Sequence, residues 1–441
     1  MPRVAHDVWL RRPQWARAVL STAKRPDAES LALLSWLVLF VDRDETMAAS
    51  LASDALKRPG DTRFASAALA EVLLRREQYD DALEVIAAAR CRFAHIPWYD
   101  LTLGDALVEA GRVEEAEVLM ERASSHPVLR RHALKRLSRL PLGRDDGTRA
   151  RRFLEQLVAL APNYLVYASD YVSLGRLQLE DGDLQAAAVT WRRGLTTYPR
   201  HHELRALLFD HFGDPGPAVT PRIAAVNEDE LGVRRIPVRS PLITARTGVL
   251  RVVKEAITGQ LEPGDVIALA ESAAAIGQGR FLPLELVRPG LLATFLSSFV
   301  AEWGPLHSPE GMQGAVMEAG RLRVAVAAGA GAVGKGLGRR GWFYRVAGRR
   351  TAMIDDVAGC LPPYDHHIIF GPAHPEELAT DLAADLACPV AIVDANHYSG
   401  ASVISASEGV DRTWLTRALA DNPAGNEDEQ TPVVIVRRLT T

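Results

Sequence analysis

A small residue recurs every 34 positions through the first half of this 441-residue chain. The series runs Ala48, Ala82, Ala116 and Ala150, and Ala187 continues it after a shift of three residues. A fixed period of this length is typical of stacked supersecondary units, each of which buries its apolar face only against its neighbours. We therefore predict an all-α array of helix pairs over residues 1–212, in which each alanine marks the closest approach of two helices.

Glycine and proline stand where the ends of such helices are expected. Gly111 and Gly182 lie in two of the polar turns that precede the alanines, and glycine readily ends a helix in a left-handed conformation. Gly104 and Gly175 occupy matching places in the preceding helix of their units. Prolines, which block extension of the second helix, follow four of the five alanines, at Pro59, Pro127, Pro162 and Pro199.

This order of leucine-glycine, glycine turn, alanine and proline resembles the tetratricopeptide repeat (TPR). The expected units span 29–61, 62–96, 97–129, 130–162 and 163–201, and the third and fifth match the pattern best. A generic alanine-rich helical bundle is the alternative. The resemblance implies a concave groove that binds a protein or peptide. Six aromatic residues would either line that groove or fill the core between repeats, which is commoner at helical spacing: Trp98, Tyr99, Tyr164, Tyr167, Tyr171 and Trp191.

Length and composition limit the expected number of domains, the classes of partner and the cellular location. A chain of this length is too long for one hydrophobic core, so two or three domains are expected. The formal net charge of -4 gives no reason to expect nucleic acid or an anionic membrane as a partner. Three widely spaced cysteines fit a reducing cytoplasm. No signal-peptide segment is present at the start, and the apolar run 31–41 is too short to cross a bilayer, so we expect a cytoplasmic protein.

The helical pattern ends at a Gly- and Pro-rich stretch, beyond which short β-branched runs appear. We therefore expect a linker over 213–231 and a second domain over 232–441. Short β-branched runs predict strands at 235–244, 265–270, 322–326, 389–393 and 431–437. Helical stretches alternate with them at 248–259, 289–303, 374–387 and 411–421. Strands separated by helices indicate an α/β or α+β domain.

Six motifs in this second domain resemble, in order, the γ-glutamyl ligase family that adds glutamate to the deazaflavin coenzyme F-420. They are an Ile-Pro-Val-Arg strand start at 236–239, Gly-Asp-Val at 264–266, a Gly-Gln-Gly-Arg end at 277–280, the 349–356 element, Ile-Val-Asp at 392–394 and the closing strand 430–438. The resemblance implies a ligase-like fold and a GTP- and divalent-metal-dependent reaction that forms an amide. It also places Arg280 among the residues that face nucleotide or substrate phosphate.

Aspartates follow two apolar stretches of this domain. Asp394 ends an apolar strand, and Asp355 and Asp356 follow another apolar stretch. The ligase family has its two metal-binding aspartates at these two places, so we predict that Asp394 and one of Asp355 and Asp356 share one or two Mg²⁺ or Mn²⁺ ions. Carboxylates are suitable ligands for such hard cations. The alternative is that each aspartate caps the turn that follows its strand.

Basic residues gather near a glycine-rich stretch at 329–336. It lacks the Ser or Thr that a phosphate loop carries after its lysine, so we exclude a Walker-type fold. Lys335, Arg339, Arg340 and Arg345 either hold nucleotide or substrate phosphates or form a solvated basic loop. The adjoining aromatic run at 342–344 is expected to lie in the core.

Several further polar residues lie close in sequence to these positions. Asn396 and His397 follow the predicted metal ligand Asp394, and Glu408 is a possible third carboxylate. We interpret the Asp-His-His run at 365–367 as a surface loop, because no spacing within it suits zinc.

Together these features favour a nucleotide- and metal-dependent ligase, using GTP or ATP, that joins a small-molecule or peptide carboxylate to an amine. The repeats would recruit a protein or peptide substrate. The family's lysine before its Glu-Gly-Arg element and its Thr and Gly-Arg after the second aspartate are absent, which favours the alternative of a TPR scaffold or regulator without turnover. A hydrolase or deazaflavin-linked protein on the same domain is a third possibility. No catalytic residue is identified.

Overall fold

The computed structural model forms two compact units. The array unit contains Met1–Val166, Asp170–Trp191 and Leu282–Ile368, and the sheet unit contains Tyr167–Ser169, Arg192–Phe281 and Ile369–Thr441. Residues 282–368, which the sequence analysis placed in the second domain, therefore pack with the repeats. The structure describes residues 5, 8–140, 146–160, 166–199, 201–217, 225–300, 306–339, 341–348, 351, 354, 361–396, 400–425 and 429–439.

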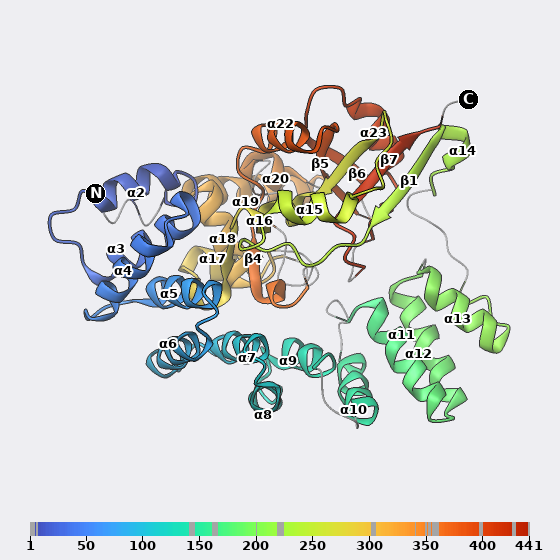
Figure 1. The fold of residues 1–441 in the computed structure, drawn as a ribbon, viewed down its shortest axis with the longest axis horizontal. Coiled ribbons are helices and arrows are strands. Elements are labelled where there is room, and N and C mark those ends of the chain that lie inside the picture. The colour runs from blue at the N-terminus through green and yellow to red at the C-terminus, as the bar shows by residue number, and fades with distance from the viewer. Residues whose placement is uncertain are drawn as a thin grey trace. The chain divides into compact units, whose positions relative to one another are not determined.

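Five helix pairs follow one another through the first half of the chain, as the alanine period predicts (Figure 1). The pairs are α3 (Ala28–Leu37) with α4 (Glu45–Leu56), α5 (Arg63–Arg75) with α6 (Tyr79–Arg92), α7 (Tyr99–Glu109) with α8 (Val113–Ala123), α9 (Arg130–Leu137) with α10 (Asp146–Ala159), and α11 (Ala168–Glu180) with α12 (Leu184–Thr197). Helix α2 (Pro13–Ser21) precedes them, η1 (Val38–Asp42) extends α3, and α13 (His202–Phe212) follows. The N-terminal half is thus a TPR-like helical repeat array.

The small residues lie where the helices of a pair meet. Ala48, Ala82, Ala116 and Ala187 are fully buried, and Ala150 is partly buried. Such complete burial fits a side chain at the closest approach of two helices, and an extra methylene at such a place forces its neighbours to move.

The glycines of the first helices serve the same close approach. A Cβ added to Gly104 would lie 2.1 Å from Cε of Met120, and one added to Gly175 would lie 2.0 Å from Nε1 of Trp191. Each glycine therefore accommodates a large side chain from the second helix of its own pair.

Left-handed residues close the turns of four pairs. Arg43, Glu77 and Gly111 have φ of 61°, 57° and 74°, and they stand 34 residues apart like the alanines. Gly182, with φ of 81°, takes this place in the last pair. The turn geometry repeats even where the residue is not glycine, although such a φ is costly for other L-residues.

Three aromatic residues of the repeats, Tyr167, Tyr171 and Trp191, are buried as the core interpretation predicts. Trp98 and Tyr99 are also buried, but Trp98 stacks with His366 and Tyr99 interacts with Glu285, so these two lie on the side of the repeats that residues 282–368 cover. Tyr164 lies outside the described residues.

The last part of the array unit, residues 282–368, is called the inserted segment below. It contains η2 (Leu284–Leu286), α17 (Leu291–Ser297), α18 (Pro309–Ala319), α19 (Arg321–Gly336), α20 (Trp342–Ala347) and η3 (Tyr364–His366). The strand predicted at 322–326 is wrong, because these residues belong to α19. Glycines of α19 face α20: a Cβ on Gly334 would lie 2.8 Å from Cγ of Trp342, and one on Gly331 would lie 3.2 Å from Cβ of Phe343. Close helix packing, rather than a loop, explains the glycine-rich stretch.

The sheet unit is built on a five-stranded mixed sheet of order β1-β7-β2-β5-β6. Its strands are β1 (Val233–Val238), β2 (Val266–Ala270), β5 (Val390–Asn396), β6 (Gly400–Ala406) and β7 (Val433–Arg438). Only the β2–β5 pairing is parallel among those described. Strands β3 (Phe281–Pro283) and β4 (His367–Ile369) form a separate two-stranded sheet. The helices are α14 (Glu228–Leu231), α15 (Val249–Ile257), α16 (Glu271–Gly277), α22 (Pro375–Leu386) and α23 (Arg412–Ala418).

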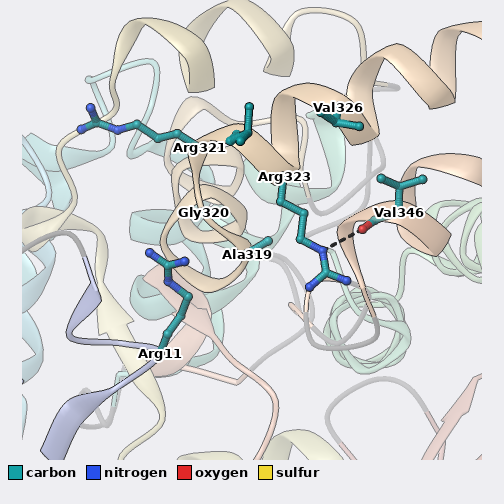
Figure 2. A pocket seen from close by; sticks show the side chains of 8 residues that line it. Arg11, Ala319, Gly320, Arg321, Arg323, Val326 and Val346 are labelled. Carbon is teal, nitrogen blue, oxygen red and sulfur yellow. Dashed lines mark hydrogen bonds between the residues drawn. The ribbon is translucent and has the colours of Figure 1, made fainter. Parts of the chain in front are cut away.

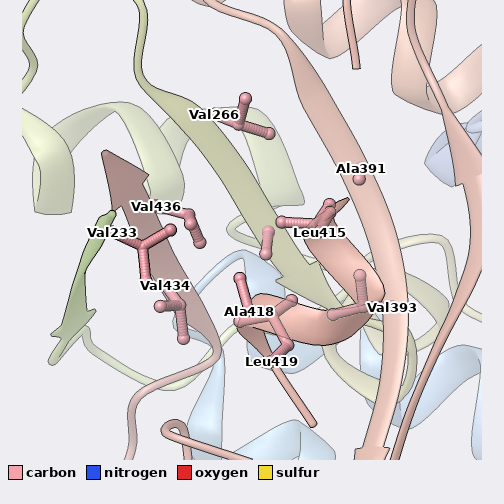
Figure 3. Packing of buried hydrophobic residues seen from close by; sticks show 10 residues of the cluster. Val233, Val266, Ala391, Val393, Leu415, Ala418, Leu419, Val434 and Val436 are labelled. Atoms are coloured by element: carbon pink, nitrogen blue, oxygen red, sulfur yellow. The ribbon is translucent and has the colours of Figure 1, made fainter. Parts of the chain in front are cut away.

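Apolar residues are buried on both faces of this sheet, which explains its nearly continuous β-branched runs. On one face, α23 contributes Leu415, Ala418 and Leu419 to a cluster with Val266 and Val434 of the strands (Figure 3). Helices α16 and α22 pack against β5. Strands are confirmed at 265–270, 389–393 and 431–437, whereas of the strand predicted over 235–244 only 235–238 are in β1. The unit mixes helices with a sheet as expected.

Among the described residues, no helix combines the length and the apolar character that a bilayer crossing requires.

Candidate functional site

Polar side chains from the first helices of three consecutive pairs converge on the inserted segment. We call these residues the first-helix face. They are Arg63 of α5, Tyr99, Thr102 and Asp105 of α7, and His132 and Arg136 of α9. Their partners in the segment lie at η2 and η3. Three neighbouring repeats therefore contribute side chains to one contact with the inserted segment.

Arg136 is the centre of this face. Its guanidinium donates to both carboxylate oxygens of Asp105, at 2.7 and 2.9 Å, and to both oxygens of Asp365, at 2.7 and 2.9 Å. Paired N–H···O bonds of this kind are strong and fix the orientation of both groups. The side chain of Arg136 is almost fully buried, and that of Asp365 is completely buried. The guanidinium therefore joins a residue of the neighbouring pair to a residue of the inserted segment.

The ionic state of this pair follows from its surroundings. Burial opposes ionisation of Asp365, but Arg136, aided by a bond from His132, outweighs it and holds the pKa of the carboxyl well below its usual range. Burial likewise opposes the charge on Arg136, and the carboxylates of Asp105 and Asp365 raise its pKa nevertheless. Both groups are thus charged at neutral pH, and each depends on the other for solvation.

A chain of hydrogen bonds continues from Arg136 to η2. Nη2 of Arg136 lies 3.1 Å from Nδ1 of His366, so this nitrogen accepts and the ring carries its proton on Nε2. Nε2 of His366 is 3.4 Å from Oγ1 of Thr102, which in turn donates to Oε1 of Glu285 at 2.7 Å. The direction of every bond is fixed, because Arg136 can only donate.

His132 completes the contacts of the buried aspartate. Its Nδ1 lies 3.0 Å from Oδ2 of Asp365, and since the carboxylate can only accept, Nδ1 carries the proton. Burial lowers the pKa of His132 despite this bond. The imidazole is therefore a neutral donor at physiological pH.

The η2 end of the site has a second arginine. Nη1 of Arg63 donates to the carbonyl oxygen of Glu285 at 2.6 Å, and its Nε is 3.1 Å from Oδ2 of Asp61. Arg288 also pairs with Asp61. The phenol of Tyr99 is buried nearby, where burial and the charge of Glu285 raise its pKa. Within the described part of the chain, the Tyr99 hydroxyl and Oε2 of Glu285 have no hydrogen-bond partner.

The prediction that 365–367 form a surface loop is wrong. Asp365, His366 and His367 are all buried, and burial together with the positive neighbours holds the pKa of His367 well below its ordinary value. The sequence carries a weak signal for this, because the polar run is followed at once by the apolar Ile-Ile-Phe of 368–370. Its partners could not be found from the sequence, since Arg136 and Asp365 are separated by 229 positions.

No group of three or more His, Cys, Asp or Glu side chains among the described residues is arranged to hold a metal ion. The buried site is instead a network of paired charges and ordered hydrogen bonds. Through this network the repeats bind the carboxylates of Asp365 and Glu285 and the backbone carbonyl of Glu285.

The predicted metal ligand Asp394 lies in the sheet unit. It stands on β5 opposite Ser402 of β6, one residue beyond the last β2 pairing at Val393. Although the side chain is exposed, partial desolvation raises its pKa, and a bond from Asn396 opposes that rise. Glu408 lies exposed in a turn after β6. Asp355, Asp356 and His397 lie outside the described residues.

The predicted phosphate-binding residues are divided between the two units. Arg280, in the sheet unit, donates through Nε to the carbonyl oxygen of Gly371 at 3.1 Å and stacks over Phe370. Lys335 ends α19 and Arg339 follows it in a turn, both exposed in the array unit. Arg340 lies outside the described residues. A joint nucleotide site thus remains a prediction.

No family model and no curated protein matches the chain. Among solved structures, it is similar to YrrB, described as a TPR protein with an unusual peptide-binding site (16% identity, 40% of this chain and 90% of that chain, TM-score 0.32). It is also similar to PilW, a type IV pilus biogenesis factor (16%, 47% and 96%, TM-score 0.34), and to a thermophilic TPR protein of Thermus thermophilus (20%, 42% and 100%, TM-score 0.26). At such scores the TPR-like assignment depends on the helix pairs of the chain itself.

Proposed function

We propose that this protein is a protein-binding scaffold whose first-helix face is a peptide-binding surface, held in this structure by the chain's own inserted segment. The observation that carries the proposal is the convergence of α5, α7 and α9 on residues 285 and 365. Three consecutive repeats contribute to it, and repeat arrays bind their partners through surfaces that extend over several repeats.

The chemistry of the occupant indicates the chemistry of the ligand. The face donates hydrogen bonds from Arg63, Arg136 and the neutral His132. The acceptors in the segment are the carbonyl of Glu285 and the carboxylate of Asp365. A partner that replaced the segment would need an acidic side chain for Arg136, because removing that carboxylate leaves the buried guanidinium with Asp105 alone. The ligand class is therefore a peptide segment that carries an acidic side chain.

Self-occupation lowers the apparent affinity for such a partner. A binding site that is open only part of the time binds its ligand more weakly in proportion to the open fraction. A substitution in the inserted segment that weakens its docking therefore increases the affinity for a peptide in solution, whereas a substitution in the face abolishes binding.

The test uses the full chain and a fluorescent peptide of residues 361–370. We expect the Asp365→Asn chain to bind this peptide about tenfold more tightly than the wild-type chain, measured by anisotropy. The same peptide with Asn in place of Asp365 is the matched control, and it should bind neither chain.

Adding Arg136→Met to the Asp365→Asn chain should remove binding of the peptide. Circular dichroism establishes that each variant is folded, and Thr102→Val serves as a milder variant of the face. A folded Asp365→Asn chain that binds the peptide no better than wild type would contradict the proposal.

The ligase reaction inferred from sequence is a second candidate, and the observation that favours it is the position and raised pKa of Asp394. A carboxylate beyond a parallel strand pair suits a cation, which could in turn bind a phosphate group of a ligand. The described residues supply this one carboxylate and Asn396, and they do not by themselves make a metal site. Phosphate release from GTP and ATP, with Mg²⁺ or Mn²⁺ and a panel of amino acids, tests it. Equal activity of wild type and Asp394→Asn would argue against this candidate.

A further inference from the structure

Helix α19 exposes a row of apolar side chains on the side opposite its buried face. Leu322, Val326, Val333 and Leu337 are 80%, 56%, 56% and 64% exposed. Spacings of four, seven and four residues place them in one stripe of a helix with 3.6 residues per turn. Val324, which α19 buries, lies on the opposite side of the helix, and the buried Ala327 and Gly334 lie between the two sides. The apolar row is therefore left over after the helix has packed.

The sequence around this row is strongly basic. From 319 to 354 there are eight basic residues and no acidic residue: Arg321, Arg323, Lys335, Arg339, Arg340, Arg345, Arg349 and Arg350. The net charge of -4 for the whole chain conceals this stretch, which is why no anionic membrane was expected from composition.

A shallow hollow adjoins the start of the row. It has a volume of about 600 Å³ and is lined by Arg11, Arg321 and Arg323 together with apolar side chains that include Leu322 and Val326. Figure 2 shows Arg11 and Arg323 on either side of Ala319 and Gly320, whereas Arg321 extends in another direction. Arg323 is held in place by a 2.8 Å bond from its Nε to the carbonyl oxygen of Val346. Basic and apolar groups thus share one surface.

A neighbouring helix adds large apolar side chains to the inserted segment. Leu291 and Phe295 of α17 are 93% and 62% exposed, and Phe299 beyond it is 68% exposed. Helices α17 and α19 pack against each other.

We propose that the α19 surface binds the face of an anionic lipid bilayer. The projecting Leu and Val side chains of the α19 row enter the boundary between headgroups and acyl chains, and the arginines lie at the level of the lipid phosphates. Charge complementarity indicates the occupant, because the described part of this stretch carries five basic residues and no acidic residue, and such a surface is attracted to anionic lipid and not to neutral lipid. An acidic amphipathic helix of another protein is the competing occupant, and the vesicle experiment distinguishes the two.

The experiment is co-sedimentation of the full chain with vesicles. We expect binding to vesicles of equal parts phosphatidylcholine and phosphatidylglycerol, weakening as salt is raised, and no binding to phosphatidylcholine alone. Arg321→Glu with Arg323→Glu should reduce binding about tenfold or more. Leu322→Ser with Val326→Ser should reduce it while leaving the dependence on salt.

Matched control variants lie elsewhere on the array unit. Arg122→Glu with Arg130→Glu makes the same change in charge at exposed positions, and Val118→Ser removes an apolar side chain that is 71% exposed. Neither control should change vesicle binding. Equal loss in the charge control would indicate a nonspecific effect of net charge and overturn the proposal. Failure of the wild-type chain to bind anionic vesicles would do the same, as would binding of a synthetic acidic amphipathic peptide without binding of vesicles.

Discussion

The first-helix face and the α19 surface both depend on arginine, and they place it in opposite surroundings. Arg136 is almost fully buried and donates to two carboxylates, whereas Arg321 and Arg323 are exposed in a stretch without acidic residues. A buried guanidinium fixes which parts of the chain lie together. An exposed one leaves the fold nearly unchanged and sets the attraction for an outside partner.

The largest expected effect comes from breaking the buried pair. Arg136→Met leaves Asp365 buried without its main counter-charge, and we expect a loss of about 3–5 kcal/mol in the free energy of unfolding of the array unit. Asp365→Leu alone should be similarly costly. Denaturant unfolding of the full chain, followed by circular dichroism, measures both.

The double variant Arg136→Met with Asp365→Leu sharpens this prediction. Removing both charges avoids the cost of an unpaired one, so the double variant should be clearly more stable than the sum of the two single losses predicts. Strict additivity would mean that the two residues are not coupled as the structure indicates.

A change in pH is expected to have an intermediate effect. Burial lowers the pKa of His132 and His367 in the folded chain, so the unfolded chain binds more protons once the pH falls below about 6.5, the ordinary histidine value. Stability is then complete above that value and declines below it, by up to about 1.4 kcal/mol per pH unit for each histidine. The groups facing these rings include Asp365, Arg136 and His366, and the charge of Arg136 adds to the cost of protonation.

Thermal unfolding between pH 8 and pH 5.5 checks this prediction, with the His132→Asn chain as control. The Asn amide can still donate to Asp365 but does not titrate, so the loss on acidification should become smaller. An unchanged pH profile in that variant would remove His132 from the explanation.

The smallest effect on stability is expected at the exposed arginines. Arg321→Gln should change the free energy of unfolding by less than about 0.5 kcal/mol, because exposed charges contribute little to folding. The same denaturant measurement applies. A loss comparable with that of Arg136→Met would show that the α19 surface is part of the folded core, and the contrast between the two regions would fail.

Much of the fold could be predicted from local pattern. The alanine series located all five helix pairs, because each unit packs only against its neighbours and its small residues sit at a fixed place. The strands of the sheet unit followed from apolar runs such as 389–393. In contrast, 322–326 alternate like a strand but fold as a helix, since Gly331 and Gly334 allow α20 to approach closely.

The candidate site could not be predicted in the same way. Its partners come from three repeats and from a segment 183 to 264 positions away, and no local period relates Arg136 to Asp365. The sequence offered Asp394 because an acidic residue after an apolar strand is a local signal. Asp365 has no such signal. The sequence alone does not distinguish a buried aspartate from one in a surface loop, because the distinction depends on its partner Arg136.

Hydrogen exchange of residues 364–369 tests most directly whether the first-helix face is a peptide-binding surface held by the chain itself. The full chain is measured with and without an excess of the 361–370 peptide, in which Val replaces Ile368 so that its mass differs from that of the chain. If the face exchanges occupants, the chain's own 364–369 amides exchange faster with the peptide present, while α7 and α9 stay protected. If the exchange rates of these amides stay unchanged at every peptide concentration, in both the wild-type and Asp365→Asn chains, the segment is a permanent part of the fold. That result would contradict the proposal of a peptide-binding surface.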